Sequence, residues 1–266
     1  MSVRFFHDLD EIQSRGETAV FCTIVRSSGS TPRHIGSHMI VYPSGTISGS
    51  VGGGELETQV IEAAKQVVKD GESRTIKYRF VDPAKGDVGV CGGEAEVFLE
   101  AIVPDPKLIV IGAGHVGKAV ASLGQFLGFK VTVSDDRPGF CTKESFPEAE
   151  ELIQCKMAAL PSKTQFTPAT YVVLTTRGTE VDVVGLPKIL EQPFAYLGII
   201  GSQRRWQVTK TELSKKGVAP KLLKRVHSPM GLELNAETPE EIAVSIMAEI
   251  IMNKHHGDGK SMKSLE

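Results

Sequence analysis

A glycine-rich hexapeptide at residues 112–117, GAGHVG, constrains the fold of this chain more than any other feature. It follows a short apolar run at residues 108–111 and precedes a segment with apolar residues at helical spacing. In such a loop Gly112 permits a tight turn, Gly114 lets a phosphate approach the backbone, and Gly117 lets helix and strand pack closely. This strand–loop–helix unit predicts a Rossmann-like domain that binds a dinucleotide or a similar ligand. A Rossmann fold without a ligand is the alternative.

An acidic pair supports this prediction. Asp135 and Asp136 end the next apolar run, and Asp135 stands at about the 20-residue spacing that is typical of a ribose-binding acid. A carboxylate there would accept a hydrogen bond from a ribose hydroxyl and disfavour a 2′-phosphate, so NAD fits better than NADP, although Arg137 weakens that distinction. His115 could bind a phosphate from within the loop. A solvated acidic turn and an exposed loop histidine are the alternative interpretations.

Short apolar runs alternate with amphipathic segments through the rest of this region. Further strands are expected at residues 130–134, 151–155, 171–175 and 196–200, and a helix at residues 202–217. The last helix begins at Thr238, where the sequence TPEE combines a capping box with proline at the first helical position. The alternation predicts an α/β fold with a doubly wound parallel sheet.

The N-terminal part of the chain carries a different pattern. A helix within residues 1–17 and a helix after residues 52–54 accompany apolar runs at residues 19–25, 38–42, 46–51, 74–80 and 94–102. We therefore predict a small α+β domain over residues 1–103. Pro104 and Pro106 mark the boundary to a Rossmann-like domain over residues 104–254, because closely spaced prolines stiffen a linker. Residues 255–266 are polar and are expected to fray.

Composition excludes several classes of protein. The chain has 266 residues, a formal net charge of -2 and only 6% aromatic residues, which argues against a nucleic-acid partner. No run is apolar for the roughly 18 residues of a membrane helix, and acids near the N-terminus argue against a signal peptide, so we expect a cytoplasmic protein. The four cysteines lack the spacing of a zinc site, so no metal site is predicted.

Loops that follow other strands of the parallel sheet are further candidates, because ligands bind at the carboxyl ends of such strands. Ser202 precedes a helix, and Arg204 and Arg205 lie in its first turn, where the helix dipole disfavours cations. An anionic ligand or partner would explain them. Residues 175–178 and 227–231 are candidate ligand loops, with simple turns as the alternative.

The N-terminal domain has three small-residue loops of its own. Residues 27–33, SSGSTPR, offer hydroxyls and a guanidinium, and GGG at residues 52–54 leads into a helix; both suit anion binding. The third loop places a thiol beside two glycines, where it would be accessible and could react, unless it is only a small apolar residue. The candidate binding residues of the three loops are Ser30, Arg33, Gly52, Gly53, Gly54, Glu55, Cys91, Gly92 and Gly93.

The chain resembles the XdhC/CoxI accessory factors of molybdenum hydroxylases such as xanthine dehydrogenase. The resemblance is carried in order by SSGSTPRHIGSHMIV, SGSVGGGELE, GVCGGEAEVFLE, VIGAGHVGKAVA, VTVSDDRPGF, LGIIGSQRR and HSPMGLELNAETPEEIAVSIMAEI. These stretches extend over nearly the whole chain. The resemblance implies an N-terminal XdhC/CoxI domain followed by a Rossmann-like domain.

The resemblance also implies a function. Such proteins bind the molybdenum cofactor, a pterin phosphate or its dinucleotide form, assist its sulfuration and deliver it to an apo molybdenum hydroxylase, with a cysteine desulfurase as a further partner. Many relatives carry a cysteine in the first glycine loop, in a pattern like SGGCVE. Glu55 stands at that position here, which leaves Cys91 as the candidate thiol.

Three functions remain open alongside this resemblance: a cofactor chaperone, an oxidoreductase and a redundant nucleotide-binding regulator. A non-catalytic cofactor chaperone, binding its cargo between the two domains, is favoured by the resemblance. The oligomeric state is open, and a homodimer is expected only because it is the commonest oligomer. An NAD(P)-dependent oxidoreductase that uses GAGHVG for the pyrophosphate is the alternative. The sequence lacks a recognisable catalytic pair for the second function.

Overall fold

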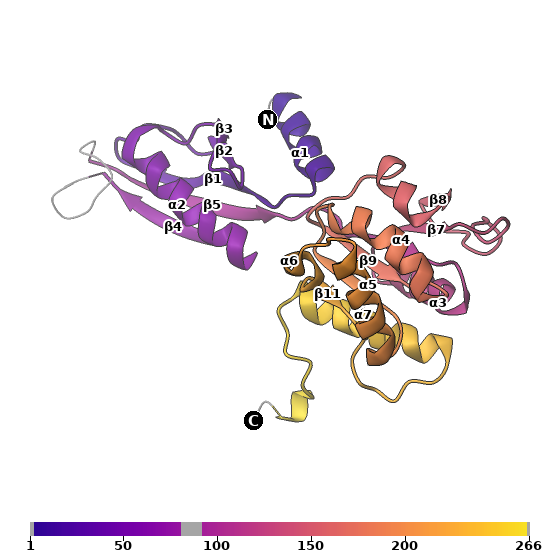
Figure 1. Ribbon diagram of the computed structural model, residues 1–266. Coiled ribbons are helices and arrows are strands. Elements are labelled where there is room, and N and C mark those ends of the chain that lie inside the picture. Colours follow the sequence, from indigo (N-terminus) through magenta and orange to yellow (C-terminus); the bar gives the residue numbers. More distant parts are fainter. Residues whose placement is uncertain (1–2, 81–91, 265–266) are drawn as a thin grey trace. The chain divides into compact units, whose positions relative to one another are not determined.

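The structure of the chain is a computed structural model that describes residues 3–80 and 92–264. The chain divides into two compact units, Met1–Pro104 and Asp105–Glu266 (Figure 1). None of the helices within the described ranges has the length and apolar character needed to cross a membrane.

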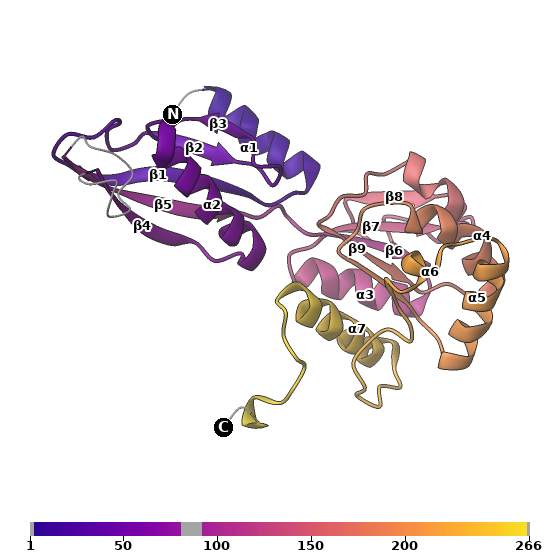
Figure 2. The ribbon, with the colours of Figure 1, turned by 60° about the vertical axis from the view of Figure 1, so that its left-hand side comes forward.

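The N-terminal unit is built on a five-stranded antiparallel sheet with strand order β3-β2-β1-β5-β4. Its elements are α1 (Val3–Arg15), β1 (Ala19–Ser28), β2 (His38–Val41), β3 (Ile47–Gly49), α2 (Gly54–Asp70), β4 (Arg74–Arg79) and β5 (Glu94–Ile102). The two helices use opposite faces of this sheet, because side chains alternate along a strand (Figure 2). On β1, Val20 and Cys22 pack with α2, whereas Ala19 and Phe21 pack with α1.

The C-terminal unit contains a six-stranded parallel sheet with strand order β11-β10-β9-β6-β7-β8. Its strands are β6 (Lys107–Ile111), β7 (Lys130–Asp135), β8 (Glu151–Gln154), β9 (Thr170–Leu174), β10 (Tyr196–Ile199) and β11 (Val226–His227). This is the order typical of dinucleotide-binding Rossmann folds, and the chain reverses direction across the sheet between β6 and β9. The predicted fold class, a small α+β domain followed by a doubly wound parallel sheet, is confirmed.

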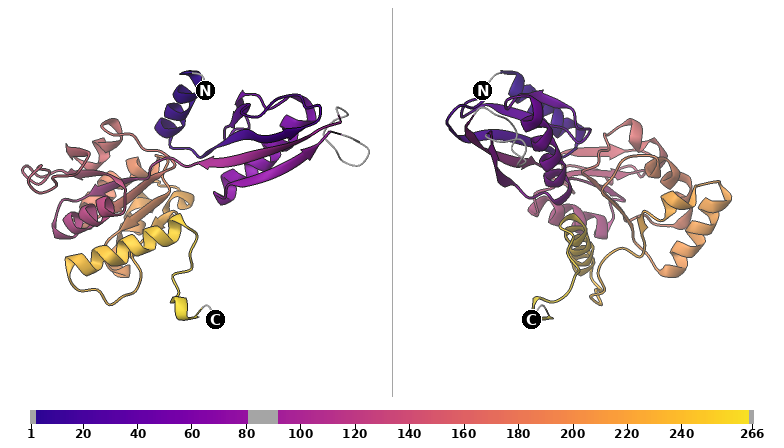
Figure 3. Two further views of the ribbon diagram at one scale, coloured as in Figure 1. Left: turned by 180° about the vertical axis from the view of Figure 1, so that it is seen from behind. Right: turned by 90° about the vertical axis from the view of Figure 1, so that its left-hand side faces the viewer.

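Helices cover both faces of the parallel sheet. They are α3 (His115–Phe126), the 3₁₀ helix η2 (Met157–Ser162), α4 (Thr179–Leu190), α5 (Gln203–Lys215), α6 (Pro220–Leu223) and α7 (Pro239–Lys254). On one face α3 and α7 lie side by side against residues such as Val110 and Val133, and Figure 3 shows α7 running along α3. On the other face η2, α4 and α5 enclose Ile109, Ile111 and Leu174.

The sequence did not predict α4, and its packing explains why. Gly185 and Pro187 lie inside this helix, and both residues weaken a helical sequence pattern. A Cβ atom at Gly185 would lie 2.5 Å from the Cβ atom of Met157, so only glycine lets α4 approach η2 this closely. Tertiary packing therefore stabilises a helix that intrinsic propensity disfavours. The capping box at Thr238, by contrast, is present as predicted.

Candidate functional site

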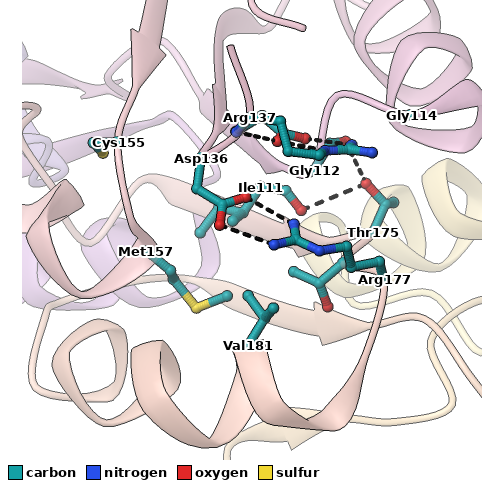
Figure 4. Close-up of a pocket in the computed structure, with 12 residues that line it drawn as sticks. Ile111, Gly112, Gly114, Asp136, Arg137, Cys155, Met157, Thr175, Arg177 and Val181 are labelled. Atoms are coloured by element: carbon teal, nitrogen blue, oxygen red, sulfur yellow. Dashed lines mark hydrogen bonds and ion pairs between the residues drawn. The ribbon is translucent and has the colours of Figure 1, made fainter.

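The main candidate site is a pocket of about 170 Å³ at the carboxyl ends of β6, β7 and β9, where the strand order reverses (Figure 4). Its walls come from the glycine loop, the two loops that follow β7 and β9, the end of β8, and the starts of η2 and α4. The lining residues are Ile111, Gly112, Gly114, Asp135, Asp136, Arg137, Cys155, Met157, Thr175, Thr176, Arg177 and Val181. Ligands of open α/β sheets bind at this position.

Two glycines of the hexapeptide are required by packing. Gly112 has a φ of 115°, and a Cβ atom there would lie 2.6 Å from the carbonyl oxygen of Thr175. A Cβ atom at Gly117 would lie 1.9 Å from the carbonyl oxygen of Gly112. The Thr175 hydroxyl donates to that same oxygen over 2.6 Å. Gly112 and Gly117 therefore fix the turn between β6 and α3, as the motif predicts.

Gly114 differs from its two neighbours in the motif. Its φ is -79°, an ordinary value, and a Cβ atom there would meet no atom within 4 Å. It lines the pocket and precedes α3, and no side chain caps that helix at its N-terminus. The fold does not need glycine at this position, but an approaching phosphate would.

The carboxylate of Asp135 is occupied by residues of its own domain. It is 4% exposed and accepts from the Ala113 N–H at 2.8 Å and from Arg137 through its backbone N–H, Nε and Nη2 at 2.8–2.9 Å. Burial alone would raise the pKa of Asp135, but the hydrogen bonds from Arg137 and Ala113 outweigh it and lower the pKa to about 2. Asp135 lies where the sequence predicts a ribose-binding acid, yet it holds the glycine loop in place.

Asp136 and Arg177 face each other across the pocket (Figure 4). The Arg177 guanidinium donates through Nη1 and Nη2 to the two oxygens of Asp136, at 2.7 and 3.0 Å. Asp136 follows β7 and Arg177 follows β9, so this ion pair connects the two loops that border the switch point. Its side chains are 29% and 49% exposed, so a ligand can reach both of them.

An apolar wall with one thiol completes the pocket. Cys155, Met157 and Val181 line it together with Ile111. Cys155 directly follows β8, and its backbone N–H donates to the carbonyl oxygen of Asp135. The sequence pattern predicts Cys155 as the end of a strand; its position at the carboxyl end of a strand in a parallel sheet is the signal that identifies it as a pocket residue.

The other candidates of this unit lie away from the pocket lining. His115 is exposed and lines a groove between α3 and α7. Ser202 caps α5 by accepting from the Arg205 N–H at 3.2 Å, and Arg204 is exposed. Arg205 turns inward and donates through Nη2 to the fully buried carboxylate of Asp182 at 2.6 Å. This ion pair gives Arg205 a partner within the protein, in place of the anionic ligand expected there.

The three small-residue loops of the N-terminal unit meet at one place. A Cβ atom at Gly93 would lie 2.3 Å from the Ser30 carbonyl oxygen, and a Cβ atom at Gly29 would lie 3.0 Å from the Gly92 carbonyl oxygen. A Cβ atom at Gly52 would lie 3.1 Å from the Cβ of Pro32. Arg33 is exposed beside this cluster. Cys91 lies outside the described residues, so its part in the cluster stays a prediction.

The glycine loop at residues 52–54 already holds an anion, which is the carboxylate of Glu57. One oxygen, Oε1, accepts from the N–H groups of Val51, Gly52 and Gly53 at 2.9–3.3 Å and from the Ser50 hydroxyl at 2.6 Å. Gly52, Gly53 and Gly54 all have positive φ values, which turn these N–H groups toward one point. Glu55 is exposed and accepts from the Gln59 side chain instead.

A second polar cluster connects β10, β11 and α7. Glu249 accepts from the Tyr196 hydroxyl at 2.6 Å and from the Gly231 N–H at 2.6 Å, and its other oxygen lies 3.3 Å from His227 Nδ1. The candidate loop at residues 227–231 is thus tied to α7. Across residues 3–80 and 92–264, no three His, Cys, Asp or Glu side chains converge as metal ligands would.

Comparison with protein families matches both units. Residues 108–250 match the XdhC Rossmann domain, and residues 12–79 match the XdhC and CoxI family. Among curated proteins, the chain is 34% identical over 262 residues to the uncharacterized protein YqeB of Escherichia coli. This match covers 98% of this chain and 48% of YqeB. It is 38% identical over 158 residues to a probable subunit of xanthine dehydrogenase from Bacillus subtilis, covering 59% of this chain and 46% of that protein.

A more distant relative has a similar length. The chain is 21% identical over 296 residues to the molybdenum cofactor insertion chaperone PaoD of Escherichia coli, covering 92% of this chain and 86% of PaoD. The chain spans about half the length of the first two relatives.

Proposed function

The chain belongs to the XdhC and CoxI family, and from this premise we propose that it is an accessory factor that binds the molybdenum cofactor as cargo. In this proposal it assists the insertion of the cofactor into a molybdenum hydroxylase such as xanthine dehydrogenase. The names of two relatives, a molybdenum cofactor insertion chaperone and a probable subunit of xanthine dehydrogenase, support that role. The observation that carries the proposal is the open space before Gly114, inside a pocket at the switch point of the sheet.

In this proposal each part of the pocket contacts a different part of the cofactor. In the dinucleotide form of the cofactor, the backbone N–H groups of the first turn of α3 receive the diphosphate, because an uncapped helix N-terminus attracts anions. Met157 and Val181 provide an apolar surface for a flat ring system. Arg177 and Asp136 border the opening and contact the polar end of the cargo. None of these binding steps requires the protein to make or break a bond, so we propose that the pocket acts as a carrier site and not as a catalytic site.

A thiol of this chain that reaches the cargo could pass sulfur to it. We propose Cys91 as the first candidate, on the sequence resemblance, and Cys155 as the second, because it lines the pocket. A cysteine desulfurase would supply the sulfur, and an apo molybdenum hydroxylase would receive the cofactor. We further propose that the protein works in the cytoplasm as a homodimer and does not bind nucleic acid.

The decisive test is cofactor retention by the purified full-length chain. The protein is mixed with molybdenum cofactor released from a molybdenum hydroxylase, and free cofactor is removed by gel filtration. We expect pterin and molybdenum to co-elute with the protein and to restore the activity of an apo hydroxylase. Co-elution without restored activity would limit the protein to storage, and absence of both would overturn the proposed function.

An NAD(P)-dependent oxidoreductase is the second candidate, favoured by the strand order and the glycine loop. The same preparation is tested for oxidation of NADH and NADPH with small carbonyl acceptors. Steady turnover without activation of an apo hydroxylase would support the oxidoreductase. The reverse outcome would support the accessory factor.

A further inference from the structure

The hydrogen bonds of Asp135 leave it no capacity for a ligand. An ionised carboxylate has about four lone-pair sites. The Ala113 N–H and Arg137 Nη2 use Oδ2, and the Arg137 backbone N–H and Nε use Oδ1. All four sites are therefore filled by the protein. A ribose diol at this end of the pocket would not find the acceptor that the sequence motif predicts.

Two guanidinium groups supply donors at the same end of the pocket. Of the five N–H bonds of a guanidinium, Arg137 directs two at Asp135 and Arg177 directs two at Asp136, so each retains three. The Arg137 guanidinium lies over the Phe140 ring, with its Cζ 3.5 Å from the ring centroid. Asp136 is the only carboxylate of the lining with spare acceptor sites, because Asp135 has none. Unused donors thus outnumber unused carboxylate acceptors.

From this imbalance we propose that the end of the pocket formed by Asp136, Arg137 and Arg177 binds a phosphomonoester in preference to a ribose diol. Arg177 exchanges Asp136 for the phosphate, because a half-exposed ion pair stabilises the protein little and a doubly charged phosphate accepts more hydrogen bonds. Arg137 keeps its place, since Asp135 and Phe140 hold it. This preference is the opposite of the one that the acid at position 135 suggests from sequence.

Two ligands carry this group. The terminal phosphate of the pterin cofactor is one source, and the part of the experiment that uses it rests on the proposed function. The 2′-phosphate of NADP is the other source, and the part of the experiment that uses NADP does not depend on the proposed function. The test measures both by isothermal titration calorimetry on the full-length chain, pairing NADP⁺ with NAD⁺ and the phosphorylated pterin with its dephosphorylated form.

We expect at least one phosphorylated ligand to bind about tenfold or more tightly than its counterpart without the monoester. A hydrogen bond to a charged group contributes enough free energy to change the affinity by about that factor. Arg177→Gln should abolish the difference within that pair. Asp136→Asn should strengthen binding of the phosphorylated ligand, because it removes a competing anion. Lys210→Gln removes a charge from an exposed position of the same unit outside the pocket, and should change neither affinity.

The outcomes separate this proposal from the proposed function. A preference for NADP⁺ together with no retention of molybdenum cofactor would support the phosphomonoester site and contradict the accessory role. Equal affinities within both pairs, no binding of either phosphorylated ligand, or weaker binding in Asp136→Asn would overturn the phosphomonoester site. Circular dichroism of each variant excludes misfolding as the cause.

Discussion

The carboxylate of Glu57 accepts a hydrogen bond from the N–H of Gly53 over 2.9 Å, within the loop that leads into its own helix. The same oxygen also receives the N–H groups of the two preceding residues. Glu57 therefore fills a backbone concavity of the kind that binds anions in other proteins. The two glycine loops of the chain consequently differ: the loop before α2 is closed by an internal carboxylate, and the loop before α3 is open at Gly114.

Glu57→Gln should destabilise the N-terminal unit by about 1–2 kcal/mol, because a neutral amide oxygen accepts these hydrogen bonds less strongly than a carboxylate. The measurement is hydrogen exchange of the amides of Val51, Gly52 and Gly53, which should speed up. Glu62→Gln, on the exposed side of the same helix, is the matched control and should leave the exchange unchanged. Unchanged exchange in Glu57→Gln would contradict the role of its charge.

The contribution of Glu57 should depend on pH with a definite sign. Burial alone would raise its pKa, but hydrogen bonds from Ser50 and the loop N–H groups outweigh it and leave the pKa below its ordinary value. A carboxyl group with a lowered pKa stabilises the fold above its unfolded-state pKa of about 4.3 and loses that effect as the pH falls through the folded value. The stability difference between wild type and Glu57→Gln should therefore be constant near pH 7 and shrink below about pH 4.

Gly114→Val should abolish ligand binding and leave the C-terminal unit folded, because its backbone is unstrained and its Cβ would enter open pocket space. Gly117→Ala should instead destabilise the unit by about 3 kcal/mol, because its Cβ would overlap the Gly112 carbonyl oxygen. Fluorescence of Trp206, the single tryptophan, reports unfolding of this unit. Retained affinity for the molybdenum cofactor in Gly114→Val would make the loop purely structural.

The sequence could predict the glycine loop because its requirements are local. Gly112 and Gly117 are needed by one turn and one strand–helix contact, and both lie within a short segment. The position of Asp135 at the end of β7 was predictable for the same reason. Its occupation by Arg137 was not predicted, because choosing between an internal guanidinium and an external ribose requires the side-chain geometry.

Contacts between segments far apart in the sequence account for the remaining differences between the predicted and the observed site. The pairing of Asp136 with Arg177 joins loops that follow different strands, and sequence alone does not show which cation an acid will meet. The sequence predicts an anionic ligand or partner for Arg205, but the buried carboxylate of Asp182 accepts its hydrogen bond. Asp182 belongs to α4, the helix that the sequence pattern did not predict, so the partner of Arg205 could not be found either.

Asp135→Asn should remove part of the acid-sensitive stability of the C-terminal unit. The pKa of Asp135 is lowered to about 2, so its carboxylate stabilises the fold above about pH 4 and this effect is lost as the pH falls toward 2. The full effect corresponds to about 2 kcal/mol. Urea unfolding followed by Trp206 fluorescence should show a steeper loss of stability between pH 4 and about 2.5 in wild type than in the variant. Parallel pH profiles would refute this assignment.

The thiols of the chain should differ in their reactivity. Cys22 is fully buried, and burial raises its pKa to about 12, so alkylating reagents should not modify it in the native protein. Cys155 lines the pocket and should react with iodoacetamide near pH 8, and bound cofactor should protect it. Peptide mapping by mass spectrometry, with and without cofactor, measures the extent of alkylation at Cys22, Cys155 and Cys91 in one experiment.

Variants then separate a thiol that borders the cargo from one that handles sulfur. Cys155→Ser and Cys91→Ser keep the size of the side chain and remove the soft ligand. If sulfur passes through one of them, that variant should retain the cofactor but deliver it without its sulfur, and hydroxylase activity should fall severalfold. Chemical sulfuration of the delivered enzyme with sulfide and a reductant should restore the activity. Full activity of both variants would remove these two thiols from the mechanism and leave the protein a carrier that acts through hydrogen bonds and charge.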